Sequence, residues 1–235
     1  MKSRTPAVVA AALGALVILA SMLAGLGSRW GWWHFSTGFS ILRWAVYASF
    51  VVMLVAVIAL LRRRGWPLAL FGLLAAVLVV GNAWSLRRTA RSVPPIHDIT
   101  TDTENPPQFV DVLPLRANAR NPAEYGGPEI AAQQREAYPD VQPLRLAIPP
   151  DSAFAHARAA ADDMGWEIVA VEPAEGRLEA TARTFWFGFY DDVVVRITPA
   201  DGGSLVDVRS VSRVGGSDVG ANAARIREFL DKLRD

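Results

Sequence analysis

The sequence predicts an α+β protein: three N-terminal transmembrane helices, followed by a soluble α/β sandwich domain built on an antiparallel sheet. Three long apolar runs without charged residues fill the first third of the 235 residues. The rest contains segments in which apolar and polar residues alternate with the period of two that is typical of strands, joined by short turns. We therefore expect a three-helix transmembrane anchor over residues 1–91 and a soluble domain over residues 92–235.

Charge divides the chain at the same place. The first 91 residues contain ten Lys and Arg residues and no Asp or Glu, whereas the remainder contains 14 basic and 23 acidic residues. A basic apolar half is typical of a membrane segment, and an acidic half repels phosphate at long range. The lipid bilayer is therefore an expected partner and nucleic acid is not. The absence of cysteine excludes disulfides and thiolate catalysis.

The expected spans are Pro6–Leu26, Trp44–Leu61 and Pro67–Trp84. Each is close to the length of about 20 residues that a helix needs to cross the hydrocarbon core. The length of the first run and its lack of a clear cleavage site favour a span over a signal peptide. No charged residue lies inside a span, which indicates an anchor rather than a transporter. Small residues at every fourth position predict close helix packing: Ala7, Ala11 and Ala15.

Orientation depends on a short loop. With the N-terminus in the cytoplasm, five basic residues lie inside and five outside, so their number does not decide. The Arg62–Arg64 triplet occupies the shortest loop, where the positive-inside rule is most reliable. We therefore expect a multi-pass protein of the inner (plasma) membrane with its soluble domain on the extracytoplasmic, periplasmic side.

The soluble domain begins with a segment rich in Pro, Asn, Asp and Thr, from residue 92 to about 128, which we expect to be extended and rich in turns. A short helix over about 128–138 and a strand over 142–148 follow. A helix over Asp151–Met164 then precedes four strands in two hairpins, and Ser217 is the expected N-cap of a final helix. The four strands are Trp166–Glu172, Arg177–Arg183, Asp191–Thr198 and Ser204–Ser212.

Several spaced motifs in this part resemble the bacterial domain of unknown function 1499 (DUF1499). They are PPIHDITTD at 94–102 followed by Pro106-Pro107, DDV at 191–193, RSxSRxG at 209–215 and SDxGxNxxRI at 217–226. The resemblance covers roughly residues 92–234. It implies a domain carried behind membrane spans, and it implies no activity, cofactor or catalytic residue.

The last two motifs supply the candidate ligand-binding residues. Arg209 and Arg213 share a strand face, which Arg196 of the neighbouring strand could extend. With the backbone amides near Ser217, they would suit a phosphate or carboxylate group. The alternative, which the pattern favours, is a polar network that pins the final helix to the sheet, with Asp218 paired to Arg213 or Arg209. The candidate residues are Arg209, Arg213, Ser217, Asp218, Asn222 and Arg225.

A possible secondary polar site comprises His97, Asp98 and Asp102. One histidine with carboxylates is chemically adequate for a divalent cation or for acid–base work. The spacing matches no known ligand pattern, however, and turn capping explains the same residues better. Asp191 and Asp192 are adjacent on a strand and should point to opposite faces. We therefore expect no metal, cofactor or catalytic residue.

The aromatic run at 185–190 (FWFGFY) has three interpretations. It could stack a ligand or touch the bilayer surface, but core packing with a glycine-marked bulge is the commoner outcome.

Three hypotheses for function follow. The first is a non-enzymatic, membrane-anchored module that binds a small anionic ligand, a lipid headgroup or a partner protein. The second is a hydrolase-like enzyme that combines the carboxylates near His97 with the arginine patch. The third is a scaffold or assembly factor whose spans hold other membrane proteins. An open pocket holding both polar groups would favour the enzyme, whereas separate, fully paired networks would favour the binding or structural module.

Overall fold

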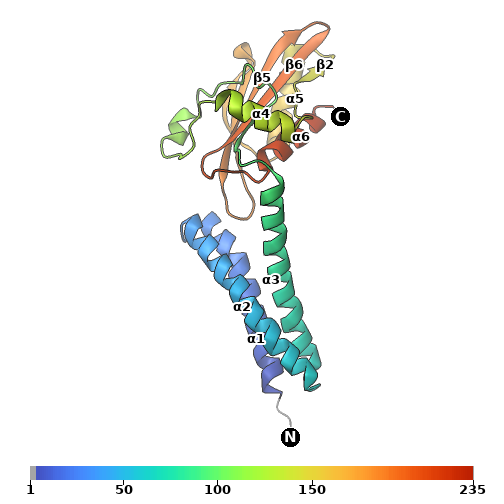
Figure 1. Cartoon of the computed structure of the whole chain (residues 1–235). Helices are drawn as coiled ribbons and strands as arrows, with labels where there is room; N and C mark the ends of the chain where they lie inside the picture. The colour runs from blue at the N-terminus through green and yellow to red at the C-terminus, as the bar shows by residue number, and fades with distance from the viewer. Residues whose placement is uncertain (1–3, 235) are drawn as a thin grey trace. The chain divides into compact units, whose positions relative to one another are not determined.

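A computed structural model describes residues 4–234 (Figure 1). The chain forms two compact units, which are described separately. The first unit holds the residues up to Thr89 together with Phe185–Gly188. The second unit holds Ala90–Thr184 and the residues from Phe189 onward.

The first unit contains the three apolar helices: α1 (Thr5–Arg29), α2 (Phe35–Leu61) and α3 (Trp66–Ser92). All three are long and apolar enough to cross a membrane. Each extends beyond the apolar run that predicts it. Helix α2 begins at Phe35 because the side chain of His34 caps it, with the backbone N of Ser36 3.3 Å from His34 Nδ1.

Small residues bring α1 and α3 together, but of the three that the sequence indicates only Ala7 is buried. The buried positions along the first half of α1 are Ala7, Ala10, Gly14 and Val17, while Ala15 is exposed. A Cβ added at Gly72 of α3 would lie only 2.4 Å from the carbonyl oxygen of Ala10. The expected spacing of four residues is therefore wrong. A helix has 3.6 residues per turn, so residues on one face are spaced alternately by three and four positions, as Ala7, Ala10, Gly14 and Val17 are.

The aromatic run belongs partly to the first unit. The Trp186 indole Nε1 donates to the carbonyl oxygen of Met22 at 3.2 Å. The buried Phe187 ring packs against Phe39, with ring centroids 4.7 Å apart. Phe185 is 81 % exposed. Of the three interpretations of this run, Phe187 therefore follows core packing, and it packs among the apolar helices of the first unit.

The second unit is built on an antiparallel sheet in the order β1-β6-β5-β4-β3. A further short strand, β2, also pairs with β6. The two longest strands, β5 and β6, are adjacent and central. The strands are β1 (Asp98–Thr100), β2 (Leu144–Leu146), β3 (Glu167–Glu172), β4 (Arg177–Arg183), β5 (Tyr190–Ala200) and β6 (Gly203–Ser212). The antiparallel α+β class is therefore confirmed, as are the two predicted hairpins.

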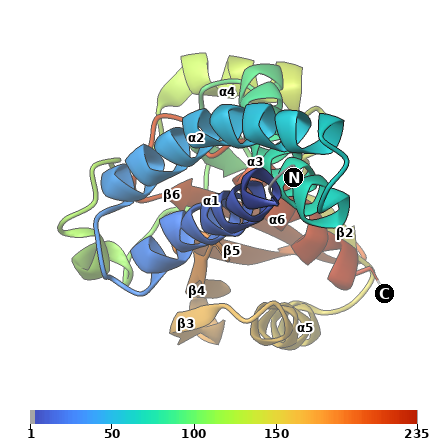
Figure 2. The ribbon, with the colours of Figure 1, turned by 90° about the horizontal axis from the view of Figure 1, so that it is seen from below.

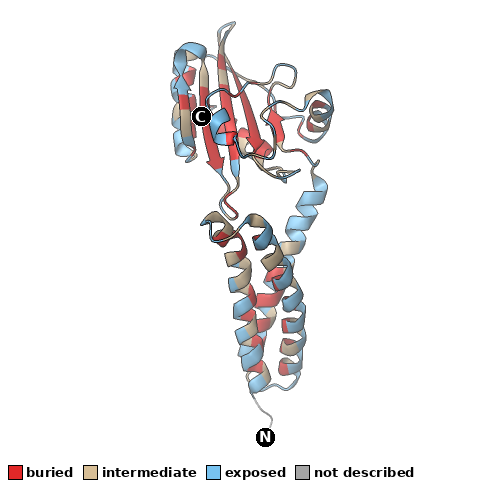
Figure 3. Cartoon of the chain, turned by 90° about the vertical axis from the view of Figure 1, so that its left-hand side faces the viewer, coloured by how far each residue is buried: buried red, intermediate tan, exposed pale blue. Residues whose placement is uncertain are grey.

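Helices α5 (Pro150–Asp163) and α6 (Ala221–Lys232) pack on the same face of the sheet (Figure 2). This helix face carries the main apolar core, in which Trp166 stacks on Phe229 with ring centroids 5.0 Å apart. Strands β1, β4, β5 and β6 are buried along most of their length, whereas β2 and β3 are largely half-buried or exposed (Figure 3). Apolar residues at alternate positions of the strands and on one stripe of each helix account for this layer.

Helix α4 (Gly127–Ala137) protects the sheet edge at β1. The buried Gln134 side chain acts as a substitute strand: its Oε1 accepts from Thr100 N at 2.9 Å, and its Nε2 donates to Thr100 O at 2.7 Å. An open edge strand would expose these backbone groups to pairing with other chains.

The outer face of the sheet, opposite α5 and α6, is covered by residues 101–125, which include the 3₁₀ helix η1 (Leu113–Arg116). Phe109 and Val112 of this cover segment form a small apolar cluster with Val194 and Val211. The sequence predicts an extended, turn-rich segment before residue 128 and does not indicate β1 or η1 within it. Three residues that begin with a carboxylate give no recognisable strand pattern.

Helix α6 begins at Ala221, so the expected N-cap at Ser217 is wrong. The N-cap residue is Gly220, and Asp218 supplies the hydrogen bonds to the helix start: its carboxylate accepts from the backbone N of Gly220 and of Asn222, both at 2.8 Å. The Ser217 hydroxyl instead accepts from Val219 N at 3.1 Å, within the turn that precedes the helix.

Candidate functional site

Charged and polar side chains form a layer on the outer face of the sheet, beneath the cover segment. Alternation along the strands places them there, because successive side chains point to opposite faces. Most of them are buried, which a charged group tolerates only when it is paired. This polar layer comprises Glu179 and Thr181 of β4, Asp192 and Arg196 of β5, Asp207 and Arg209 of β6, and the flanking Arg177 and Arg213.

Arg209 is the most enclosed member of the polar layer, with no exposed surface. Its Nε and Nη2 donate to the two carboxylate oxygens of Asp98 at 2.9 and 2.8 Å. Nη1 donates to the carbonyl oxygen of Pro107 at 3.2 Å, and Nη2 donates also to that of Ala123 at 2.7 Å. The Phe109 ring lies 5.1 Å from the guanidinium. Arg209 therefore ties β1 and the cover segment to β6 and, being fully enclosed, is not accessible to a ligand.

Arg196, at the middle of the polar layer, also joins the sheet to the cover segment. Its Nη2 lies 2.9 Å from Asp207 and 3.0 Å from Asp102. Asp102 also caps its own turn by accepting from the backbone N of Glu104 and Asn105. Although burial acts to raise it, these amide and Arg196 hydrogen bonds lower the pKa of Asp102 below its ordinary value. The turn-capping interpretation of Asp102 is therefore confirmed.

Arg213 lies at the far end of β6, in a cluster with one carboxylate and two guanidiniums. Its Nε and Nη2 donate to Asp192 at 2.9 and 2.7 Å. The Arg116 Nη1 donates to the same carboxylate at 2.5 Å, and the Thr181 hydroxyl does so at 2.7 Å. Its hydrogen bonds to Asp192 raise the pKa of Arg213 above its ordinary value. Arginine side chains are charged in proteins at neutral pH. Arg116, Arg213 and Asp192 together carry one more positive than negative charge, and Glu167 is a further acidic group near enough to act on Arg213 electrostatically.

An aromatic ring extends this cluster toward a third arginine. The guanidinium of Arg213 lies 5.2 Å from the ring centroid of Tyr190, and that of Arg183 lies 5.0 Å from the same ring. The Arg213 side chain is 18 % exposed, whereas that of Arg209 is fully enclosed. Within residues 4–234, Nη1 of Arg213 donates no hydrogen bond. One edge of this guanidinium is therefore available to a ligand.

Asn222 and Arg225 face the other side of the sheet. Arg225 pairs with Asp191 at 2.6 Å and donates to the Ser210 hydroxyl at 3.0 Å. Asn222 accepts from that hydroxyl at 2.7 Å and donates to the carbonyl oxygen of His97 at 3.0 Å. This network fixes α6 on β6, β5 and the residue before β1, as the structural interpretation of the sequence proposes.

The candidate residues therefore do not converge. Arg209 and Arg213 lie on the outer face with different carboxylates, Asn222 and Arg225 lie on the helix face, and Ser217 and Asp218 form the turn before α6. Neither arginine pairs with Asp218. Since Asp218 occupies the amides at the start of α6, these amides offer no anion site.

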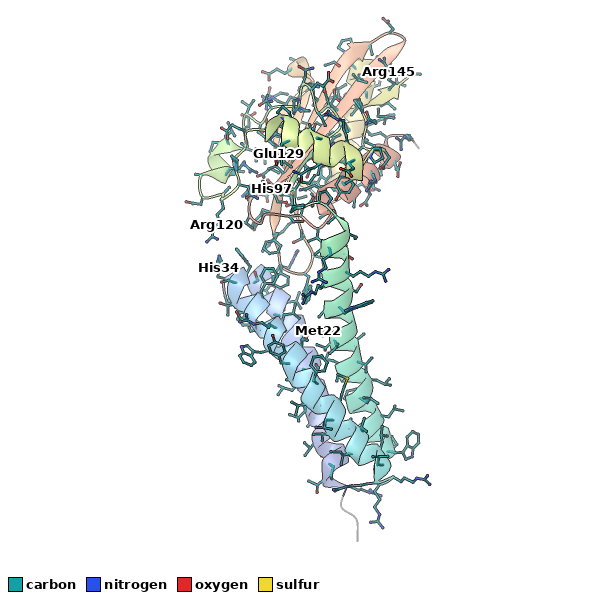
Figure 4. The ribbon with its side chains drawn as sticks, in the orientation of Figure 1. Met22, His34, His97, Arg120, Glu129 and Arg145 are labelled. Atoms are coloured by element: carbon teal, nitrogen blue, oxygen red, sulfur yellow. The ribbon has the colours of Figure 1, made fainter. Side chains whose placement is uncertain are left out.

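The secondary polar site is also divided. Asp98 pairs with Arg209 and Asp102 with Arg196, while His97 (labelled in Figure 4) contributes its backbone oxygen to Ser212 N and to Asn222. No group of three His, Asp or Glu side chains suited to a metal ion occurs among residues 4–234. Asp191 and Asp192 point to opposite faces, as expected.

Arg116 is the member of the Arg213 cluster that sequence reasoning missed. It belongs to η1, in a segment without periodicity, and its partner Asp192 is 76 residues away in sequence. The only available signal is a basic residue within a Pro- and Asn-rich stretch, and that does not distinguish a buried arginine from a solvated one.

The fold and site thus define an antiparallel α+β domain, stabilised by buried ion pairs and preceded by three long apolar helices. A family model described as "Protein of unknown function (DUF1499)" matches residues 98–233. The chain belongs to this family. No curated protein matches it.

Proposed function

We propose that the protein is a membrane-anchored, non-enzymatic binding module whose C-terminal domain binds a phosphate or carboxylate group at Arg213. The observation that carries this proposal is the excess positive charge of the cluster in which Arg116 and Arg213 share Asp192. A partly exposed guanidinium edge beside a second one suits a charge-assisted contact with an anion.

The surroundings of Arg213 support an accessible site. Gly215 and Gly216 follow it and are exposed. A Cβ added at Gly216 would meet no atom within 4 Å, so the space beside the backbone is open. Arg183 lies across the Tyr190 ring and adds a further positive charge. The carboxylates near His97, in contrast, are paired in separate networks, which favours a binding module over the hydrolase alternative.

The test is ligand-induced thermal stabilisation of the full chain in detergent micelles, with inorganic phosphate, with acetate and with chloride as the control for ionic strength. At about ten times its dissociation constant, a ligand stabilises the folded state by about 1.4 kcal/mol. Phosphate or acetate should raise the unfolding midpoint of the wild type and not that of Arg213→Gln. Arg183→Gln, which leaves the Asp192 pair intact, should show a reduced shift.

Arg145→Gln is the matched control. Arg145 is exposed on β2 and lies at the opposite end of the domain from His97 and Arg120 (Figure 4). Arg145 lies opposite Leu205 of β6. Leu205 and Arg213 are eight residues apart along the chain, which corresponds to about 26 Å at 3.3 Å per residue. Equal phosphate shifts in the wild type and all three variants would overturn the proposal.

We further propose that the N-terminus is cytoplasmic and the domain extracytoplasmic, in the plasma membrane. The connection between α2 and α3 supports this topology, because it is only four residues long and contains Arg62, Arg63 and Arg64. A reporter fused to the C-terminus tests it: alkaline phosphatase should be active there and green fluorescent protein dark when exported through the general secretion route. The reverse pattern would place the domain in the cytoplasm.

A further inference from the structure

The first unit contains a cavity of about 310 Å³ among its three apolar helices. Leu26 of α1, Leu42 of α2 and Leu78 of α3 contribute apolar walls, and Trp186 lies at one side. The surrounding helices are long and apolar enough to span a bilayer. The medium around such a cavity is therefore lipid rather than water.

Two polar side chains line this otherwise apolar space. The Ser21 hydroxyl oxygen is buried and has no hydrogen-bond partner. Asn82 also lines the cavity, and its side-chain amide makes no hydrogen bond within residues 4–234. The Ser21 hydroxyl is thus a buried polar group without a partner, whereas Asn82 is exposed on the surface of α3; in an apolar environment either group is costly without a hydrogen bond. An occupant that offers hydrogen-bonding groups would remove this cost.

Positive charge lies next to the cavity. Arg43 follows the lining residue Leu42, and Arg87 follows the lining residue Leu86. Neither arginine makes an ion pair or a hydrogen bond within the described residues 4–234. No acidic residue occurs in the first 91 residues to neutralise them. Neither arginine itself lines the cavity. Their long side chains can reach toward its polar end, and basic groups between spanning helices bind anionic lipid headgroups.

We propose that this cavity binds one acyl chain of an anionic membrane phospholipid. The apolar walls would hold the chain, Ser21 and Asn82 would hydrogen-bond the ester region, and Arg43 and Arg87 would contact the phosphate. This inference concerns the first unit and does not rest on the Arg213 site.

The test uses the full chain, delipidated in mild detergent and mixed with equal mole fractions of phosphatidylglycerol and phosphatidylcholine. Native mass spectrometry counts the bound lipids. The wild type should retain one lipid, predominantly phosphatidylglycerol. Ala83→Trp, which fills the cavity from α3, should lose the bound lipid. Ser21→Leu is a smaller change in the same cavity that should also lose the lipid, and it serves as the test if Ala83→Trp does not fold.

Val77→Trp is the matched control, because Val77 lies on the same helix, is 49 % exposed and does not line the cavity. It should retain the lipid. Arg43→Gln/Arg87→Gln should still bind lipid but lose the preference for phosphatidylglycerol. Equal lipid retention by Ala83→Trp, Ser21→Leu and Val77→Trp would overturn the proposal, since it would identify only the lipid that surrounds any membrane helix. Absence of bound lipid from the wild type would overturn it as well.

Discussion

Arg209 and Asp98 face each other through two parallel hydrogen bonds of 2.9 and 2.8 Å, in the interior of the second unit. The pair joins the central strand β6 to β1, which lies 111 residues earlier in the sequence. A fully enclosed guanidinium of this kind depends on its carboxylate, because neither ion has access to water.

Arg209→Met should therefore destabilise the protein by about 3–5 kcal/mol, since it leaves Asp98 buried without a partner. Arg209→Lys should recover only part of this loss, because an ammonium group cannot form the two parallel hydrogen bonds. The unfolding midpoint in denaturant, followed by tryptophan fluorescence, measures both. Arg227→Gln, which breaks the exposed pair with Asp140, is the control and should change stability by no more than about 1 kcal/mol. Similar losses for Arg209→Met and the control would refute the role of the buried pair.

Val219 adopts a left-handed backbone conformation with φ of 56°. This region is unfavourable for a β-branched residue, at about 1–3 kcal/mol, and asparagine tolerates it better. Val219→Asn should raise the thermal midpoint. Val171→Asn, at a similarly exposed valine in strand β3, should lower it slightly. A lowered midpoint for Val219→Asn would mean that the valine side chain stabilises the turn by more than the strain.

Protonation of Asp218 at acid pH should increase its contribution to the stability of the folded protein. Burial raises the pKa of Asp218 above its ordinary value, against the hydrogen bonds from the Asn222 and Gly220 amides. A carboxyl with a raised folded-state pKa binds its proton more tightly in the folded state. Stability therefore falls as pH rises from the unfolded pKa, at about 4, through the folded one.

Asp218→Asn lacks this titration. The stability advantage of the wild type over the variant should therefore be largest below about pH 4 and shrink as pH rises. Unfolding midpoints at a series of pH values measure the difference. An advantage that grows with pH would show that the ionised carboxylate is the better cap for α6.

Close contact between α1 and α3 makes Gly72 sensitive to a single methyl group. Gly72→Ala would place a Cβ about 2.4 Å from Ala10 O and should destabilise the helix bundle. Gly81→Ala is the control on the same helix, because a Cβ there would meet no atom within 4 Å. It should be neutral or stabilise α3 by up to about 1 kcal/mol. Thermal unfolding in detergent separates the two; equal effects would exclude the tight contact.

The sequence predicts the apolar helices and the two hairpins well, because their periodicity is local. The strand Arg177–Arg183 has the predicted bounds, and α5 differs by one residue at each end. The outer face of the sheet was less accessible to prediction. Alternation places Asp207 and Arg209 on a face that would ordinarily be solvated, and their burial depends on a cover segment without periodicity.

The Arg213 cluster illustrates the same limit at the candidate site. The sequence places Arg213 near an anion-compatible turn, but its partner Asp192 and the competing Arg116 come from other parts of the chain. Ion pairs between residues far apart in sequence leave no local sequence pattern. Whether an arginine binds a ligand or a buried carboxylate is therefore decided by the three-dimensional fold.

The pairing of the first strand, β1, with the last strand, β6, has a consequence for biogenesis. β6 is central, yet it is the last strand to be synthesised, and β1, β2 and β5 all pair with it. Until the ribosome reaches residue 212, the earlier strands lack their principal neighbour, and their pairing must then close loops of up to about 100 residues. The apolar helices, in contrast, are complete before the first strand is made. Synthesis of the apolar helices therefore precedes completion of the sheet, and only β3, β4 and β5 can pair with one another before β6 emerges.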